Sequence, residues 1–253
     1  MLKKVYKFLN IKGAVLDKNQ LEKYMEKIAA EHNLQSFSNS KTYPVSRLKD
    51  NFKFISKTYS VLNEHVKLGI GIYPAGEWLL DNYYIIDETV KTVIKEITPK
   101  KYKSFLGIAN GPYRGYARVY VLASEIVAYS DNKIDYENLK FAILAYQKNK
   151  TLTMEEIWSL QLFLQIAIIE NIRQICETIY SSQLQKYKVE NIVERLVEQK
   201  DFRNQKYKNV KQDIKHSEYV QLKYPFVEYM SYKLKRYGKA RFAISKHTRR
   251  TSK

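Results

Sequence analysis

The stretch that most constrains the fold of this chain lies at residues 151–180 and reads "TLTMEEIWSLQLFLQIAIIENIRQICETIY". It contains Thr153 and Glu156 in the Thr-x-x-Glu spacing of a capping box, in which each side chain bonds the other residue's backbone N–H at the start of a helix. The residues that follow are apolar almost all round, which predicts the central and most buried helix of a bundle. The pattern allows this helix to continue past Ser181 and Ser182 to Glu198.

The rest of the chain also favours helices. Apolar residues alternate at spacings of four and three from Leu48 to Val66, which predicts a helix of about five turns. The chain has only 8 Gly and 5 Pro among 253 residues, and no segment alternates like a strand. Further helices are expected at 17–33, at 76–97, from Pro112 to 129, at 136–148 with Asp135 as N-cap, and in "PFVEYMSYKLKRYG", whereas 34–44 is expected to be a loop.

The expected fold class is therefore all-α, a multi-helix bundle around a central apolar helix with a basic C-terminal tail. Three segments are expected: an N-terminal helical segment at 1–70, a helical core at 71–200, and a Lys-rich linker, amphipathic helix and basic tail at 201–253. The single Cys176 excludes an internal disulfide and fits a reducing compartment. No secretory signal opens the chain, and its longest apolar stretch is far short of the ~20 residues that span a bilayer, so a soluble chain is expected.

The net charge of +18 is concentrated at one end. Residues 232–253 contain nine Lys or Arg and no acid, whereas the rest of the surface mixes both signs. A basic tail can bind phosphates of nucleic acid or an anionic membrane surface, and it can also be a solvated terminus. All three interpretations remain open from the sequence.

Acidic and aromatic residues near helix starts are the candidate site. Glu77 and Asp81 are four residues apart and share a helical face, which fits either an acid/base pair or structural ties between helices. We favour the structural interpretation, a polar seam of interhelical ion pairs. Trp side chains in it could stack on sugars, although helical Trp is more often core. The seam is expected to comprise Glu77, Trp78, Asp81, Asn82, Asn110, Arg114, Arg118, Glu125, Glu156, Trp158, Glu170, Asn171 and Arg173.

Signatures of cofactor or metal chemistry are weak. The segment 131–135 lacks the glycine and terminal Glu of a calcium-binding EF-hand loop. The four histidines are scattered, and the sequence has no HExxH, CxxC, P-loop or GxGxxG pattern. Glu155 and Glu156 are neighbours, so on a helix they point about 100° apart and cannot readily act together. No catalytic residue, metal site or cofactor is expected.

From Tyr73 to about Tyr180, the chain resembles the N-terminal region of the bacterial cyclic β-1,2-glucan synthase family. The matching pieces, in order, are "YPAGEWLLDNYYIIDE", "LGIANGPYRGYARVYVLASEIVAYSDNKID", "AYQ" at 145–147 and "LTMEEIWSLQLFLQIAIIENIR". The later "PFVEYMSYKLKRYG" also resembles the segment that follows in the family. One departure is "TMEEIW", where the family pattern has Gly before the second Glu.

The resemblance implies a location rather than a chemistry. In this family a helical N-terminal region precedes a membrane glycosyltransferase and a phosphorylase-like portion, and the Asp-x-Asp and Gln-x-x-Arg-Trp-type motifs of transfer are absent here. The resemblance implies a non-catalytic accessory domain at the cytoplasmic membrane face, packing against the transferase of the same or a neighbouring polypeptide. It also implies that the polar seam could line a groove for a glucan. A basic module that binds nucleic acid or anionic membrane is the alternative, and an enzyme that uses Glu77 and Asp81 is a third hypothesis.

Overall fold

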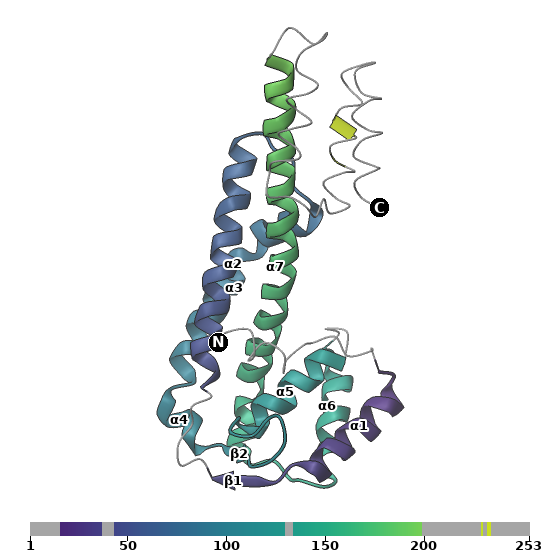
Figure 1. The fold of residues 1–253 in the computed structure, drawn as a ribbon. Coiled ribbons are helices and arrows are strands. Elements are labelled where there is room, and N and C mark those ends of the chain that lie inside the picture. Colours follow the sequence, from purple (N-terminus) through teal and green to yellow (C-terminus); the bar gives the residue numbers. More distant parts are fainter. Residues whose placement is uncertain (1–15, 37–42, 130–133, 199–228, 230–231, 234–253) are drawn as a thin grey trace. The chain divides into compact units, whose positions relative to one another are not determined.

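The computed structural model describes residues 16–36, 43–129, 134–198, 229, 232 and 233. Over these residues the chain forms helices and one small antiparallel sheet, which confirms the all-α class (Figure 1). The elements are α1 (Lys18–Glu31), β1 (Leu34–Ser36), α2 (Pro44–Lys67), α3 (Pro74–Glu96), α4 (Pro99–Ser104), β2 (Leu106–Ile108), α5 (Arg118–Tyr129), α6 (Tyr136–Gln147) and α7 (Met154–Glu198). None of the described helices has the length and hydropathy of a membrane span.

Helix α7 is the long helix that the sequence predicts. It begins at the predicted capping box, because Thr153 N donates to Glu156 Oε2 at 2.8 Å and Glu156 N donates to Thr153 Oγ1 at 3.3 Å. It continues without a break past Ser181 and Ser182 for a total of 45 residues. The most completely buried helix is nevertheless α5, in which every residue from Arg118 to Val127 is buried. The prediction that α7 is the most buried helix is wrong, because α7 exposes apolar side chains at its start.

Helix α5 begins at Arg118 and not near Pro112, so the predicted start is also wrong. The preceding residues form a tight loop, in which Gly115 N donates to Ile108 O at 2.8 Å and Ile108 N donates to Tyr116 O at 2.9 Å. Gly115 has a φ of 90°, a conformation that other residues adopt rarely. These bonds hold residues 108–116 in a loop where the sequence pattern predicted the first turn of a helix. The loop connects β2 to α5.

Two short elements were not expected. Strand β1 pairs with β2 in an antiparallel register that places Leu34 opposite Ile108, although 34–44 was predicted to be a loop. Helix α4 follows the N-cap Thr98 and carries Pro99 in its first turn. Strands of three residues are too short to show an alternating pattern, and a six-residue helix shows little periodicity.

The described residues divide into two compact units. Unit 1 comprises the described residues up to Lys57 together with Asn82–Ile175, and unit 2 comprises Thr58–Asp81 and the described residues from Cys176 onward. Helices α2, α3 and α7 each contribute residues to both units.

The core of unit 1 is aromatic where α4, α5 and α7 meet. The rings of Phe105 and Phe163 lie 5.3 Å apart edge to face, and Tyr102 and Tyr120 lie within 6.5 Å of Phe163. The Tyr102 hydroxyl also accepts a hydrogen bond from Ala117 N at 2.9 Å, which ties α4 to the start of α5. This core positions the buried polar groups described below.

Unit 2 is packed closely around a glycine. A Cβ at Gly76 would lie 3.2 Å from Leu62 Cδ2, so the Leu62 side chain would have to shift by a few tenths of an ångström to accept a larger residue there. Lys186 is 8% exposed, and its Nζ lies 4.6 Å from the ring of Tyr73 and 5.0 Å from that of Tyr229. Burial lowers the pKa of Lys186, although Glu190 opposes the shift. Tyr229 belongs to the predicted C-terminal helix, most of which lies outside the described residues.

Candidate functional site

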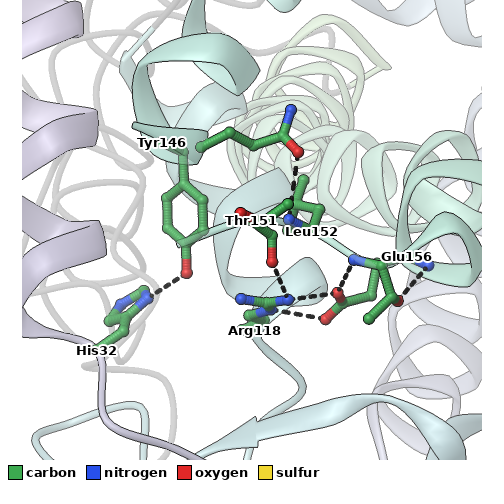
Figure 2. A network of polar contacts seen from close by, with 8 residues as sticks. His32, Arg118, Tyr146, Thr151, Leu152 and Glu156 are labelled. Atoms are coloured by element: carbon green, nitrogen blue, oxygen red, sulfur yellow. Dashed lines mark hydrogen bonds and ion pairs between the residues drawn. The ribbon is translucent and has the colours of Figure 1, made fainter. Parts of the chain in front are cut away.

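The centre of the candidate site is a buried ion pair between α5 and the start of α7 in unit 1 (Figure 2). Arg118 Nε donates to Glu156 Oε1 at 2.8 Å, and Arg118 Nη2 donates to Glu156 Oε2 at 2.7 Å. Arg118 Nη2 also donates to Thr151 O at 2.8 Å. The side chains are 2% and 0% exposed, so water screens this pair very little.

Glu156 therefore has two structural roles. Its Oε2 accepts one bond from Arg118 and another from Thr153 N, and its Oε1 accepts the second bond from Arg118. Both oxygens of the carboxylate thus accept charge-assisted bonds and the side chain is 0% exposed, which fits a structural role for Glu156. Glu155 points elsewhere and accepts a bond from Ser104 Oγ at 2.8 Å, as expected for neighbours on a helix.

The network extends from Arg118 toward α1 through Tyr146 and His32 (Figure 2). The Tyr146 hydroxyl lies 2.9 Å from His32 Nδ1. Burial, reinforced by the charges of Arg118 and Lys150, lowers the pKa of His32 to about 4. Burial also raises the pKa of Tyr146 to about 12, so His32 and Tyr146 are both uncharged at neutral pH.

A second buried carboxylate, Glu170, joins α7 to α2 and α5. Its Oε1 lies 2.9 Å from Arg47 Nε and accepts a hydrogen bond from the Tyr120 hydroxyl at 3.1 Å. Burial raises the pKa of Glu170, although the charge of Arg47 opposes this shift. Within the described part of the chain, Glu170 Oε2 has no hydrogen-bond partner. On the next turn, Arg173 lies 5.2 Å from the ring of Phe54.

A third buried carboxylate, Glu125, is held by two tyrosines. The Tyr24 hydroxyl of α1 donates to Glu125 Oε2 at 2.7 Å, and the Tyr113 hydroxyl donates to Glu125 Oε1. Burial, together with the nearby Glu125, raises the pKa of both tyrosines, so they remain protonated donors. The cluster holds the loop before α5 and helix α1 against α5.

The acids on α3 do not belong to these buried networks. Glu77 and Asp81 are both exposed, and Trp78 is 52% exposed. The exposure of Asp81 does not fit the predicted seam between packed helices, because sharing a helical face with Glu77 does not determine which face is buried. Asn82 is half-buried.

The remaining predicted residues divide in the same way. Asn110 bridges the loop to α1 by donating to Glu31 O at 2.8 Å and accepting from Asn33 N at 2.9 Å. Arg114 is exposed in the loop, and Asn171 is half-buried on α7. Trp158 is 75% exposed, so it is not the core Trp favoured by the sequence.

The structure thus joins Arg118 directly to Glu156, and the charge of Arg173 opposes the rise in the pKa of Glu170. Arg118, Glu125 and Glu170 also have partners that the sequence did not reveal. Those partners are Arg47, Tyr24, Tyr113, Tyr120, Tyr146 and His32. Tyrosine is the commonest aromatic residue here, with 22 in the chain, so a single Tyr gave no usable signal. Among the described residues, no group of three or more His, Cys, Asp or Glu could hold a metal ion.

Comparison with known proteins supports the resemblance seen in the sequence. No family model matches the chain. The cyclic beta-(1,2)-glucan synthase NdvB of Rhizobium meliloti (strain 1021) is 27% identical over 156 residues, which are 62% of this chain. The chain spans only 6% of the length of that relative. The chain is therefore related to the cyclic β-1,2-glucan synthase family.

Proposed function

We propose that this chain is a non-catalytic helical accessory domain of a cyclic β-1,2-glucan synthase-like protein. It would pack against and support a membrane glycosyltransferase region of the same or a neighbouring polypeptide, at the cytoplasmic face of the bacterial membrane. The observation that carries the proposal is the similarity over 62% of the chain to a small part of NdvB.

The buried networks support a structural rather than a catalytic role. Glu156 uses both carboxylate oxygens in bonds to Arg118 and to its own helix start. Glu125 likewise accepts one tyrosine hydroxyl on each oxygen. A general acid or base needs an oxygen within reach of substrate, and neither residue offers one in this arrangement.

A glucan contact is part of the proposal, and the exposed face of α3 is the surface that suits it. Trp78 presents about half of its side chain to solvent between the exposed acids Glu77 and Asp81. An indole face can stack on a pyranose ring while carboxylates accept bonds from hydroxyl groups. The two acids of this face, Glu77 and Asp81, are both exposed, so they do not form a buried acid/base pair.

The decisive test is co-purification. The tagged chain should capture the glycosyltransferase region encoded with it, and the purified chain alone should neither turn over UDP-glucose nor cleave β-1,2-glucan. Glu156→Gln, which should loosen unit 1, should weaken the capture, whereas the matched control Glu155→Gln should not. Turnover by the pure chain that is lost in Glu77→Gln would instead favour the enzyme hypothesis.

The second candidate function is a basic module that binds nucleic acid or an anionic membrane, which the net charge of +18 favours. Most of the basic tail lies outside the described residues. Tight binding of duplex DNA or single-stranded RNA at physiological salt, with no capture of a transferase, would favour this candidate.

A further inference from the structure

A basic helix and an exposed apolar helix face meet at one place in unit 1. Helix α4 ends at Ser104, whose Oγ donates to Glu155 Oε1 in the first turn of α7 at 2.8 Å. Trp158 lies three residues after Glu155 and therefore on the same side of α7. This contact places the end of α4 beside the exposed start of α7.

The apolar part of this surface is formed by Met154, Ile157 and Trp158. Their side chains are 60%, 38% and 75% exposed, and Trp158 is the most exposed of the large apolar residues in the described chain. Ile157 and Trp158 lie three and four positions after Met154, so the Met154 side chain is a neighbour of both on the helix surface. A Trp with this exposure contributes little to the core and is suited to contact another phase or partner.

The basic part comes from α4. Lys100 and Lys103 are exposed and Lys101 is half-buried, while Tyr102 between them is buried and anchors the helix. At the start of α7, Glu156 is paired with Arg118, whereas Glu155 accepts a bond from Ser104, which carries no charge. The three lysines of α4 therefore outnumber the one carboxylate here that is not paired with Arg118. The surface therefore combines positive charge with exposed Trp, Met and Ile.

We propose that this surface, formed by Lys100, Lys101, Lys103, Met154, Ile157 and Trp158, binds the interface of an anionic lipid bilayer. The indole ring would lie at headgroup depth and the lysines would contact anionic headgroups, the division of roles found in proteins that lie on membranes without crossing them. A neutral glucan carries no charge for the lysines to bind, and a nucleic acid backbone offers no apolar surface for Met154 and Ile157. The lipid interface uses both halves of the surface.

This inference rests on the proposed function only for its membrane setting, and it assigns the contact to the folded unit 1 rather than to the basic tail. Sedimentation with vesicles cannot test it, because the tail alone can carry the chain to anionic lipid. The readout has to be local to Trp158.

The chain has two Trp residues, which allows an internal control. The indole is excited at wavelengths that the 22 tyrosines do not absorb, so the emission comes from Trp158 alone in Trp78→Phe and from Trp78 alone in Trp158→Phe. Both residues are exposed, so both full-length variants should fold as the parent does, which circular dichroism checks. Each variant is titrated with phosphatidylcholine vesicles, with and without phosphatidylglycerol, including lipids brominated on their acyl chains.

We expect the fluorescence of Trp158 to shift to shorter wavelength and to be quenched by brominated lipid only when phosphatidylglycerol is present. Trp78, which lies between acids, should show neither effect. Replacing all three α4 lysines by Gln in the Trp78→Phe background should weaken the Trp158 response about 10- to 100-fold. The same replacement at three exposed lysines of other helices, Lys53, Lys67 and Lys95, should change it less than threefold.

An unchanged Trp158 spectrum with anionic vesicles would overturn the proposal, as would equal quenching of both Trp residues. A Trp158 response to β-1,2-glucan or duplex DNA but not to vesicles would replace the lipid with that ligand. Capture of the transferase region is measured separately, so its failure would count against the proposed function and leave the Trp158 result intact.

Discussion

Glu156→Gln tests whether the buried ion pair holds unit 1 together. Glutamine has nearly the same shape and still suits a capping box, so its side-chain oxygen can keep the bond from Thr153 N. What it removes is the negative charge opposite Arg118, whose side chain is 2% exposed. Removing one partner of a buried pair costs about 3–5 kcal/mol, because the other charge stays buried without compensation.

For a chain of this size, 1 kcal/mol corresponds to about 2–4 °C in melting temperature, so Glu156→Gln should lower it by about 6–20 °C. Circular dichroism at increasing temperature and urea denaturation both measure this loss. Glu155→Gln is the matched control, because that neighbour is half-buried and accepts a single bond from Ser104. We expect its cost to stay below about 1 kcal/mol.

A double-mutant cycle with Arg118→Met separates the ion pair from other effects. Each single variant leaves one unpaired charge, whereas the double variant leaves none, so the double should cost about 2–3 kcal/mol less than the sum of the singles. The reasoning fails if Glu156→Gln costs less than about 1 kcal/mol, or if the two single costs simply add.

Three further predictions concern other parts of the molecule. The pKa of His32 is lowered to about 4, so the folded state binds fewer protons than the unfolded state between pH 4 and pH 6.5. The free energy of unfolding should therefore be at its full value above about pH 6.5 and fall as the pH is lowered to about 4. His32→Gln should reduce this pH dependence, as measured by urea denaturation at each pH. Tyr24→Phe and Tyr113→Phe should each cost about 1–3 kcal/mol, because each removes a donor from the buried Glu125, and a cost below 0.5 kcal/mol (about the surface-site value) in both would contradict the assigned bonds. Trp158→Ala and Asp81→Ala should each change stability by less than about 0.5 kcal/mol, whereas Phe163→Ala in the core should cost about 3–5 kcal/mol; a large loss in Asp81→Ala would restore the buried tie that the structure contradicts.

The helices could be predicted from the sequence where their signals are local. The capping box joins Thr153 and Glu156, which are only three positions apart, and the N-cap Asp135 accepts a bond from Asn138 N at 2.7 Å, as its position suggested. The start of α5 could not be placed this way, because Pro112 suits the first turn of a helix as well as it suits a loop. The loop is decided by bonds between Ile108, Gly115 and Tyr116 that no periodicity reports.

The candidate site could be predicted in its charged members but not in their pairing. Arg118, Glu125, Glu156 and Glu170 were all expected in a polar seam, and all four are buried. Their partners are distant in sequence: Tyr24 lies 101 residues from Glu125, and one sequence without an alignment contains no signal that joins such positions. The exposed acids of α3 were placed in the same seam because helical spacing shows which residues share a face and not what that face contacts.

The shared use of Glu156 has a consequence for the order of folding. The bond of Glu156 with Thr153 joins positions three apart, but the bonds of Glu156 with Arg118 join positions 38 apart. In a partly folded chain where α5 has not docked, Arg118 does not contact Glu156. The first turn of α7 then keeps only its weaker local bonds. That turn should therefore exchange its amide hydrogens at the rate at which α5 undocks, and not at the faster rate of an ordinary fraying helix end.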